Sequence, residues 1–241
     1  PALAAVRRTA GIVLTERSQP APFIDLAGVR HRGGDYLAER SANTRQQLRR
    51  SDRFYERDGP IRVDRAQSVP AARAMLDRLA DLHQASWIRR GQPGSFAIPF
   101  FRRFHAALIE SGLPRGEVAL LSVSSGETVI GFLYNFVLRD RMVAYQSGFA
   151  YSDEASHAKP GLTCHLAAIR YALGQGIDIY NLLAGDSRYK RSLSDHSEPQ
   201  FWLRAGPRWS PRLLPHALFR LRQPKARLSA DLTVPRAQQS A

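Results

Sequence analysis

The first half of the chain alternates helical patterns with one short strand pattern. Residues 1–34 are rich in Pro, Gly and Arg and show no sustained periodicity, so we expect an irregular lead-in there. Apolar residues at three- and four-residue spacings predict helices in three places, and alternating apolar and charged residues predict a strand. The predicted helices span residues 35–57, the segment after Val69-Pro70 that ends near Gly91, and residues 99–111, and the strand spans residues 61–66.

Strand patterns dominate the second half. Short polar turns separate the apolar segments 118–123, 128–138 and 142–151, which predicts an antiparallel meander. An apolar helix over 162–173 follows, closed by Gly174 and Gly176, and then strands over 177–183 and 200–205. A meander that passes into a strand–helix–strand crossover predicts an α/β fold of the α+β type: a mixed, largely antiparallel central sheet flanked by helices.

The net charge of +14 is the most unusual feature of the composition. A basic surface attracts phosphates, nucleic acids and acidic membranes. However, only Lys159, Lys190 and Lys225 are lysines among the 35 basic residues, and this excess of arginine is typical of coding bias. The charge is therefore weak evidence for a nucleic-acid partner, and we expect no DNA partner. The three lysines stand out because arginine is the usual cation of this chain.

Cys164 is the single cysteine, which excludes an internal disulfide and a multi-cysteine zinc site. The histidines show no close spacing typical of metal ligands, so no metal is expected. No apolar segment approaches the roughly 20 residues that span a bilayer. We expect a cytoplasmic protein.

The most distinctive segment covers residues 180–193 and contains Gly185-Asp186 followed by Tyr189-Lys190. It resembles the end of the CelD-like acetyltransferase domain of the GNAT superfamily, where a strand ending in a Gly-Asp turn precedes a Tyr-Lys pair. Three further pieces follow the expected order within a resemblance that covers roughly residues 36–205. They are Leu82-His83 with Trp87 and Arg90-Gly91, the meander ending at Gly148-Phe149, and Pro160-Gly161 at the start of the long helix.

The family is also similar to the FemAB-type aminoacyl-tRNA transferases, which are tandem GNAT-like domains. The resemblance implies that this chain holds mainly the C-terminal GNAT-like half. Residues 1–34 would be a lead-in or a remnant of a preceding half, and residues 35–206 the acyltransferase domain. Residues 207–241 would be a basic tail with a short amphipathic helix, which caps the domain or touches a membrane surface.

The resemblance implies transfer of an acyl group from acyl-CoA, with acetyl-CoA as the donor expected in this family, to a small-molecule or saccharide amine. The setting that it implies is polysaccharide or cell-envelope biosynthesis. The donor phosphates are expected at the helix start, because free backbone amides and the helix dipole attract anions there. The usual Arg/Gln-x-x-Gly-x-Gly/Ala loop is absent, so CoA is implied by the family and not by a motif. The expected phosphate-binding residues are Lys159, Gly161, Leu162 and Thr163.

The catalytic residues implied by the resemblance lie on a mobile turn after the strand. Lys190 would offset negative charge on a donor phosphate or on a tetrahedral intermediate, and Tyr189 would protonate the leaving thiolate. Asp186 would position Lys190 or Arg188, or stabilise the turn. Candidates for a base are His83, Asp153, Glu154, His157 and His165. Histidines within apolar helices are more often core residues, which disfavours His83 and His165.

Two alternatives stay open at this point. A FemAB-like enzyme would take its aminoacyl group from tRNA and would use the basic surface directly. A degenerate GNAT domain without catalysis would act as a binding module, and the missing phosphate loop favours this interpretation.

Overall fold

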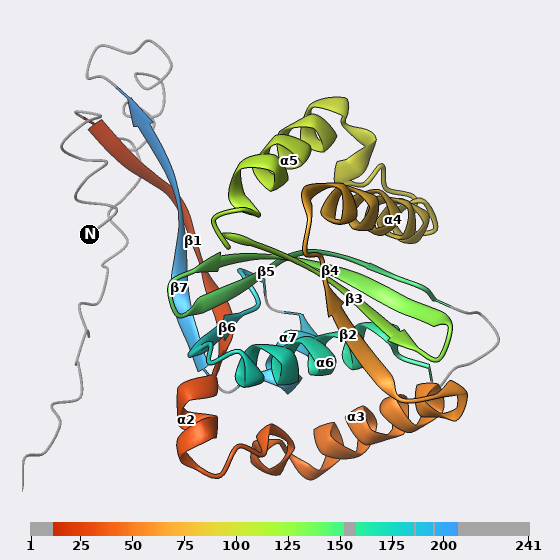
Figure 1. Cartoon of the computed structure of the whole chain (residues 1–241). Helices are drawn as coiled ribbons and strands as arrows, with labels where there is room; N and C mark the ends of the chain where they lie inside the picture. Colours follow the sequence, from red (N-terminus) through yellow and green to blue (C-terminus); the bar gives the residue numbers. More distant parts are fainter. Residues whose placement is uncertain (1–11, 152–157, 186, 195, 207–241) are drawn as a thin grey trace, which may run out of the picture. The chain divides into compact units, whose positions relative to one another are not determined.

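The computed structural model describes residues 12–151, 158–185, 187–194 and 196–206 (Figure 1). The described residues fall into two compact units, one within residues 19–200 and a smaller one that contains residues 12–18 and 201–206. In the smaller unit the guanidinium of Arg17 lies 3.9 Å over the Trp202 ring. The larger unit contains every helix that the structure describes and the cavities discussed below.

The described strands form one sheet in the order β2-β3-β4-β5-β6-β1-β7. Neighbouring strands from β2 to β5 are antiparallel, β5 and β6 are parallel, and β6 and β1 are antiparallel. The mixed, largely antiparallel sheet confirms the predicted fold class. The strands are β1 (Ile12–Asp25), β2 (Ile61–Arg65), β3 (Val118–Ser125), β4 (Thr128–Leu138), β5 (Arg141–Phe149), β6 (Ile179–Asn181) and β7 (His196–Gly206).

Helices cover both faces of the central strands (Figure 1). Helices α4 and α5 pack on one face with an apolar cluster around Leu79, Ile109 and Tyr134. Helices α2, α3 and α6 pack on the other face with a second cluster. The helices are α2 (Leu26–His31), α3 (Ala42–Tyr55), α4 (Val69–Ile88), α5 (Pro99–Gly112), α6 (Pro160–Gly174) and α7 (Arg188–Leu193). None of them combines the length and the apolarity needed to cross a membrane.

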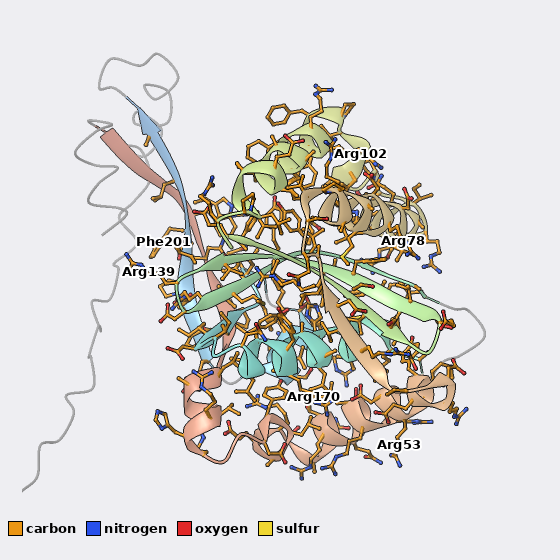
Figure 2. All side chains as sticks on the ribbon, viewed as in Figure 1. Arg53, Arg78, Arg102, Arg139, Arg170 and Phe201 are labelled. Atoms are coloured by element: carbon orange, nitrogen blue, oxygen red, sulfur yellow. The ribbon has the colours of Figure 1, made fainter. Side chains whose placement is uncertain are left out.

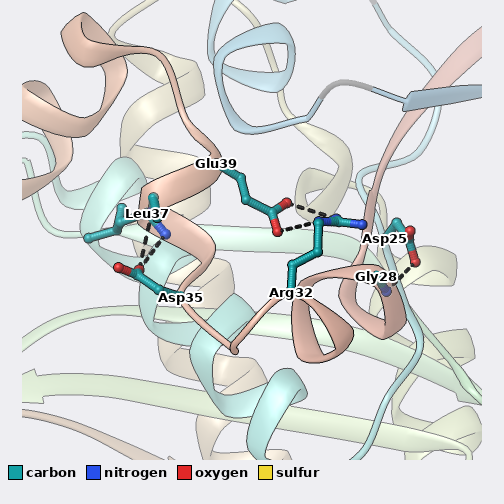
Figure 3. Close-up of polar contacts among 7 residues, drawn as sticks. Asp25, Gly28, Arg32, Asp35, Leu37 and Glu39 are labelled. Carbon is teal, nitrogen blue, oxygen red and sulfur yellow. Dashed lines mark hydrogen bonds and ion pairs between the residues drawn. The ribbon is translucent and has the colours of Figure 1, made fainter.

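The helix predicted over residues 35–57 is divided by two separate caps. Asp35 accepts hydrogen bonds from the amides of Leu37 and Ala38 and starts the short 3-10 helix Tyr36–Glu39 (Figure 3). Ser41 then caps α3 by accepting from the amide of Thr44. Because each cap residue has non-helical backbone angles, the single predicted helix is wrong over its first seven residues, 35–41.

The irregular lead-in predicted for residues 1–34 is wrong where the structure describes it. Residues 12–25 form β1, residues 26–31 form α2, and Asp25 caps α2 through the amide of Gly28 (Figure 3). Pro20 and Pro22 hide the strand in the sequence because proline cannot donate to a sheet ladder. Their carbonyls still accept hydrogen bonds from the amides of Gly185 and Leu182, at 3.3 and 2.9 Å.

Strand β5 packs closely against helix α4 at Gly148, which has no side chain. A Cβ atom at Gly148 would lie 2.3 Å from the backbone oxygen of Leu79 on α4. On β4, a Cβ at Gly131 would lie 2.7 Å from the backbone oxygen of Gly148. Backbone atoms cannot swing away as a side-chain end can. The two glycines therefore set how closely α4, β5 and β4 pack.

Gly148→Ala is expected to lower the free energy of unfolding by about 1–3 kcal/mol, because the added methyl overpacks a backbone contact. Gly174→Ala, at the end of α6, is the matched control, since a Cβ there meets nothing within 4 Å. It should leave stability unchanged or raise it by up to about 1 kcal/mol. Denaturant unfolding measures both, and equal stability of the two variants would contradict the close packing.

A partly buried ion pair links helix α3 to helix α6. Arg170 on α6 donates from Nη1 to Asp52 Oδ2 on α3 at 3.0 Å, and Figure 2 shows Arg170 between the two helices. The Asp52 side chain is buried, whereas half of Arg170 is exposed. Burial raises the pKa of Asp52 above its usual value, and the charge of Arg170 opposes this shift only in part. The ionised carboxylate therefore costs stability in the folded state.

A raised pKa in the folded state means that the folded protein binds the proton more tightly than the unfolded chain. The stability of the wild type relative to Asp52→Asn should therefore increase as the pH falls from 7 through the folded pKa. Paired urea titrations of both proteins across this range measure the difference. If the stability of the wild type relative to Asp52→Asn instead decreased as the pH falls, the attraction between Asp52 and Arg170 would outweigh the cost of burying the carboxylate.

Candidate active site

The site lies where β5 and β6 separate. The two strands pair only at Arg141–Val143 and Ile179–Asn181. Beyond that point β5 continues to Phe149, while the chain after β6 turns away at Leu183, a non-glycine residue with a φ of 58°. The edge of β5 from Ala144 onwards is thus not paired with any described strand. Its backbone groups are available to other partners.

A β-bulge lies at the start of this open edge. Tyr134 of β4 is opposite Gln146 and Asn135 is opposite Ala144, which leaves Tyr145 as the extra residue of β5. A bulge increases the local twist and changes the direction of side chains. It therefore directs β5 away from β6 at the point where the pairing stops.

Two adjoining cavities lie along the part of β5 that is not paired with β6. The larger has a volume of about 650 Å³ and the smaller about 190 Å³. The smaller one lies between β5 and the segment Leu182–Ala184. The linings of the two cavities have five residues in common: Tyr145, Gln146, Ser147, His165 and Tyr189.

The start of α6 lies on the larger cavity, together with Tyr189 of α7. Lys159, Gly161 and Leu162 all line it. Gly161 packs against an aromatic ring, since a Cβ there would lie 3.2 Å from Cε2 of Phe149. The expected donor site and the expected catalytic tyrosine thus share one cavity.

The amides at this helix start are not equally available. Those of Leu162 and Thr163 donate to the backbone oxygen of Lys159, at 2.9 and 3.2 Å. Thr163 is fully buried, and its hydroxyl lies 2.8 Å from the hydroxyl of Ser51 on α3. The exposed ammonium of Lys159 donates to Gln47 Oε1 at 3.2 Å. Of the expected phosphate-binding residues, Lys159, Gly161 and Leu162 line the larger cavity, and Thr163 instead holds the helix in place.

Tyr189 and Lys190 lie on the short helix α7 and not on the turn that the sequence predicted. Lys190 lines the smaller cavity, and its Nζ donates to the backbone oxygens of Leu183 and Ala184, at 3.1 and 2.9 Å. Burial lowers the pKa of Lys190. Burial, followed by the neighbouring Tyr151, raises the pKa of Tyr189. Lys190 thus fixes the turn that forms one wall of the cavity.

His165 of α6 lies at the junction of the two cavities. It is only 4% exposed, and its ring stacks on that of Tyr189 with centroids 5.3 Å apart. Its Nδ1 is buried without a hydrogen-bond partner. Burial, and then the charge of Lys190, lower the pKa of His165 to about 4. Its burial agrees with a core residue, but its position on both cavities is not readable from the sequence.

The rest of the larger cavity has an aromatic wall and a basic rim. Trp87 lies beside the buried ring of His83 on α4, and the guanidinium of Arg90 lies 5.8 Å from the Trp87 ring. Nδ1 of His83 is 3.3 Å from Gln84 Oε1, and burial lowers the pKa of His83. The charged side chains among the described lining residues of the two cavities are cationic: Arg90, Lys159 and Lys190.

Several expected site residues lie outside the described residues. They are Asp186, Asp153, Glu154 and His157, together with the C-terminal tail over 207–241. Within the part of the chain that the structure describes, no group of three or more His, Cys, Asp or Glu side chains is arranged to hold a metal ion. Cys164 is buried, which raises its pKa well above the usual value and keeps the thiol protonated.

Sequence reasoning missed the contributions of β5 and of Ser51. The sequence predicts only a strand of the meander at Tyr145, Gln146 and Ser147, because period-two patterns do not reveal a bulge or an unpaired edge. Ser51 was one polar residue among many on α3. The signal that could have marked it is its position at the buried face of that helix, beside Leu48 and Tyr55.

Solved structures share this fold at low sequence identity. The C-terminal domain of a putative lysylphosphatidylglycerol synthetase from Agrobacterium fabrum has a TM-score of 0.52 and 14% identity, with 90% of this chain and 67% of that chain covered. L-PGS from Bacillus licheniformis has a TM-score of 0.53 and 13% identity over 91% and 69%. FemX has a TM-score of 0.55 and 10% identity over 80% and 60%. At these identities the likeness shows a common fold.

No curated protein matches the sequence. The family model described as acetyltransferase (GNAT) domain matches residues 42–191, which include Lys159, Gly161, His165, Tyr189 and Lys190. The resemblance to the GNAT superfamily is thereby confirmed. Because this match covers more than half of the sequence, the chain belongs to the acetyltransferase (GNAT) domain family.

Proposed function

We propose that this chain transfers an acyl group, most simply acetyl, from acyl-CoA to an amine. Family membership supports acyl transfer in general, and the site supports the particular donor. The observation that carries the proposal is the shared cavity: Lys159 and Gly161 at the start of α6 line it together with Tyr189. Its volume of about 650 Å³ lies within the range of small-molecule and cofactor sites.

The charges of the cavity fit an anionic donor. Lys159 and Arg90 lie on the larger cavity and Lys190 on the smaller one. Cations near a partly enclosed cavity raise the local concentration of phosphate groups. The aromatic wall would cover the uncharged arm of the donor, because such surfaces favour apolar ligand groups.

The proposed chemistry is direct transfer. The acceptor nitrogen attacks the thioester carbonyl, and backbone amides on the open edge of β5 and the charge of Lys190 offset the negative charge that develops on oxygen. Tyr189 then protonates the leaving thiolate. Its raised pKa keeps the phenol protonated at neutral pH, which this role requires. Asp186 is proposed to position a nearby cation.

The acceptor is proposed to be a small-molecule or saccharide amine, and polysaccharide or cell-envelope biosynthesis is the proposed setting. Transfer from aminoacyl-tRNA is the second candidate, favoured by the net charge of +14 and by the structural likeness to FemX. The third candidate is a binding module, which would hold a ligand in the cavity and catalyse no reaction. The location is proposed to be cytoplasmic, with the tail over 207–241 as a possible peripheral membrane contact.

Acetyl-CoA is expected to stabilise the folded chain, by about 2.7 kcal/mol at a concentration 100 times its Kd. Thermal unfolding with acetyl-CoA, longer acyl-CoAs, free CoA and ATP measures this effect. A shift with every CoA species that exceeds the shift with ATP supports the donor. Salt-sensitive binding of tRNA without any response to CoA species would instead favour the tRNA-dependent reaction.

Lys190→Met is expected to lower turnover by about 100-fold or more, since it removes a positive charge at the developing oxyanion. It also leaves the oxygens of Leu183 and Ala184 without their donor, so a moderate loss of stability is expected. The measurement is thiol release from acetyl-CoA with a panel of amino sugars as acceptors.

Arg53→Met is the matched control for charge removal, because Arg53 lies on the outer side of α3 (Figure 2). It should leave turnover unchanged. If Lys190→Met folded and kept full turnover, Lys190 would have only its structural role at the cavity wall.

A further inference from the structure

Two buried histidines in the described part of the chain each have a ring nitrogen without a partner. His105 on α5 is 2% exposed and His165 on α6 is 4% exposed. The unpartnered atoms are Nε2 of His105 and Nδ1 of His165. A buried polar atom without a hydrogen bond costs about 1–3 kcal/mol, so each requires an explanation.

The surroundings of the two histidines differ. His105 lies among aromatic rings, and its Nδ1 is 3.3 Å from the hydroxyl of Tyr134. It lines neither of the two cavities. His165 has no hydrogen bond to any described residue and lines both cavities. An imidazole that has no hydrogen-bond partner among the described residues and lies at the junction of two cavities is available to a ligand.

The groups around His165 indicate which role it has in the proposed reaction. Its ring stacks on Tyr189, the proposed donor of a proton to the leaving group. The positive charge of Lys190 is near enough to act on it. The open edge of β5 supplies Gln146 and Ser147 to the same two cavities. The reacting carbonyl is expected among these groups, because the three elements β5, α6 and α7 meet there.

The protonation state follows from burial. With a pKa of about 4 the imidazole is neutral at pH 7 and carries one N–H. Nδ1 is buried with no acceptor nearby, so it carries a bare lone pair and the proton belongs on Nε2. Nε2 is not among the buried atoms that lack a partner, and His165 lines both cavities, so Nε2 is the ring nitrogen that a ligand can reach. The ring therefore presents a neutral donor to the cavity. Its low pKa makes it a poor base for an amine.

We propose that His165 is a further catalytic residue, which donates a hydrogen bond from Nε2 to the acyl carbonyl oxygen of the donor at the junction of the two cavities. The inference deepens the proposed function and rests on it. Its role is that of an oxyanion donor, and the proton stays on Nε2 throughout the reaction.

The amine nitrogen forms a bond to the carbonyl carbon, and the electron pair of the C=O bond moves to oxygen, which accepts from His165. When the C=O bond re-forms, the C–S bond breaks with its electron pair on sulfur. Tyr189 protonates the thiolate, and the acceptor nitrogen loses its extra proton to water, from which Tyr189 regains one.

Isotope-edited infrared spectroscopy of bound [1-13C]acetyl-CoA tests the proposal without an acceptor amine. A hydrogen bond weakens the C=O bond, so the carbonyl band of the wild-type complex should lie at lower wavenumber than that of His165→Phe. His165→Asn, which retains an N–H donor, should give an intermediate band. The wild-type band should not move between about pH 6 and pH 9, because the imidazole stays neutral there.

His105→Phe is the matched control, since it removes an equally buried histidine that has an unpartnered nitrogen but lies on neither cavity. Its complex should give the wild-type band. Bound acetyl-CoA with the same band in wild type and His165→Phe would overturn the role of His165 and leave the proposed function standing. Absence of acetyl-CoA binding to the wild type, measured by the thermal shift, would overturn both.

Discussion

The short parallel pairing of β5 with β6 is the constraint on which the site depends. Three residues of each strand are in register, and then β5 continues while the chain after β6 turns away. Backbone groups on the exposed edge of β5 are strong hydrogen-bonding groups, so they need water or a ligand. A longer β6 would satisfy them internally and would fill the space of the smaller cavity. The end of the pairing therefore leaves space for the smaller cavity beside β5 in an otherwise continuous sheet.

The segment after β6, which lines the smaller cavity opposite β5, is held by hydrogen bonds to residues that are distant in the sequence. The amide of Leu182 donates to Pro22, that of Gly185 to Pro20, and that of Ala184 to the side chain of Gln200. Lys190 then binds the carbonyls of Leu183 and Ala184. The prolines of β1 cannot donate to a ladder but can accept, so they hold the turn without extending the sheet into the cavity. One lysine thus combines a structural role with a charge beside the cavity.

Much of the fold could be predicted from the sequence, because the meander, α4, α5 and α6 have clear periodicities and turns. Strand β1 was missed because its prolines read as loop, and α7 because a helix of six residues offers too little periodicity. The pairing of Tyr189-Lys190 with the Pro160-Gly161 region in one site came from family resemblance. The roles of Tyr145, Ser51 and His165 depend on a bulge, a helix contact and a cavity junction. These features arise from tertiary packing, which no local pattern encodes.

Burial moves every titrating group at the junction toward its neutral form. It raises the pKa of the phenol of Tyr189, lowers that of the imidazole of His165 to about 4, and lowers that of the ammonium of Lys190. A neutral phenol and a neutral imidazole each carry a proton that can be donated in a hydrogen bond, so neither has to change its protonation state when a substrate binds. Such fixed donors stabilise a developing negative charge more strongly than water does, because they need not reorient. Under the proposed function, these groups are better suited to stabilising an oxyanion than to removing a proton from the acceptor, and the deprotonation step would fall to water or to a group beyond this junction.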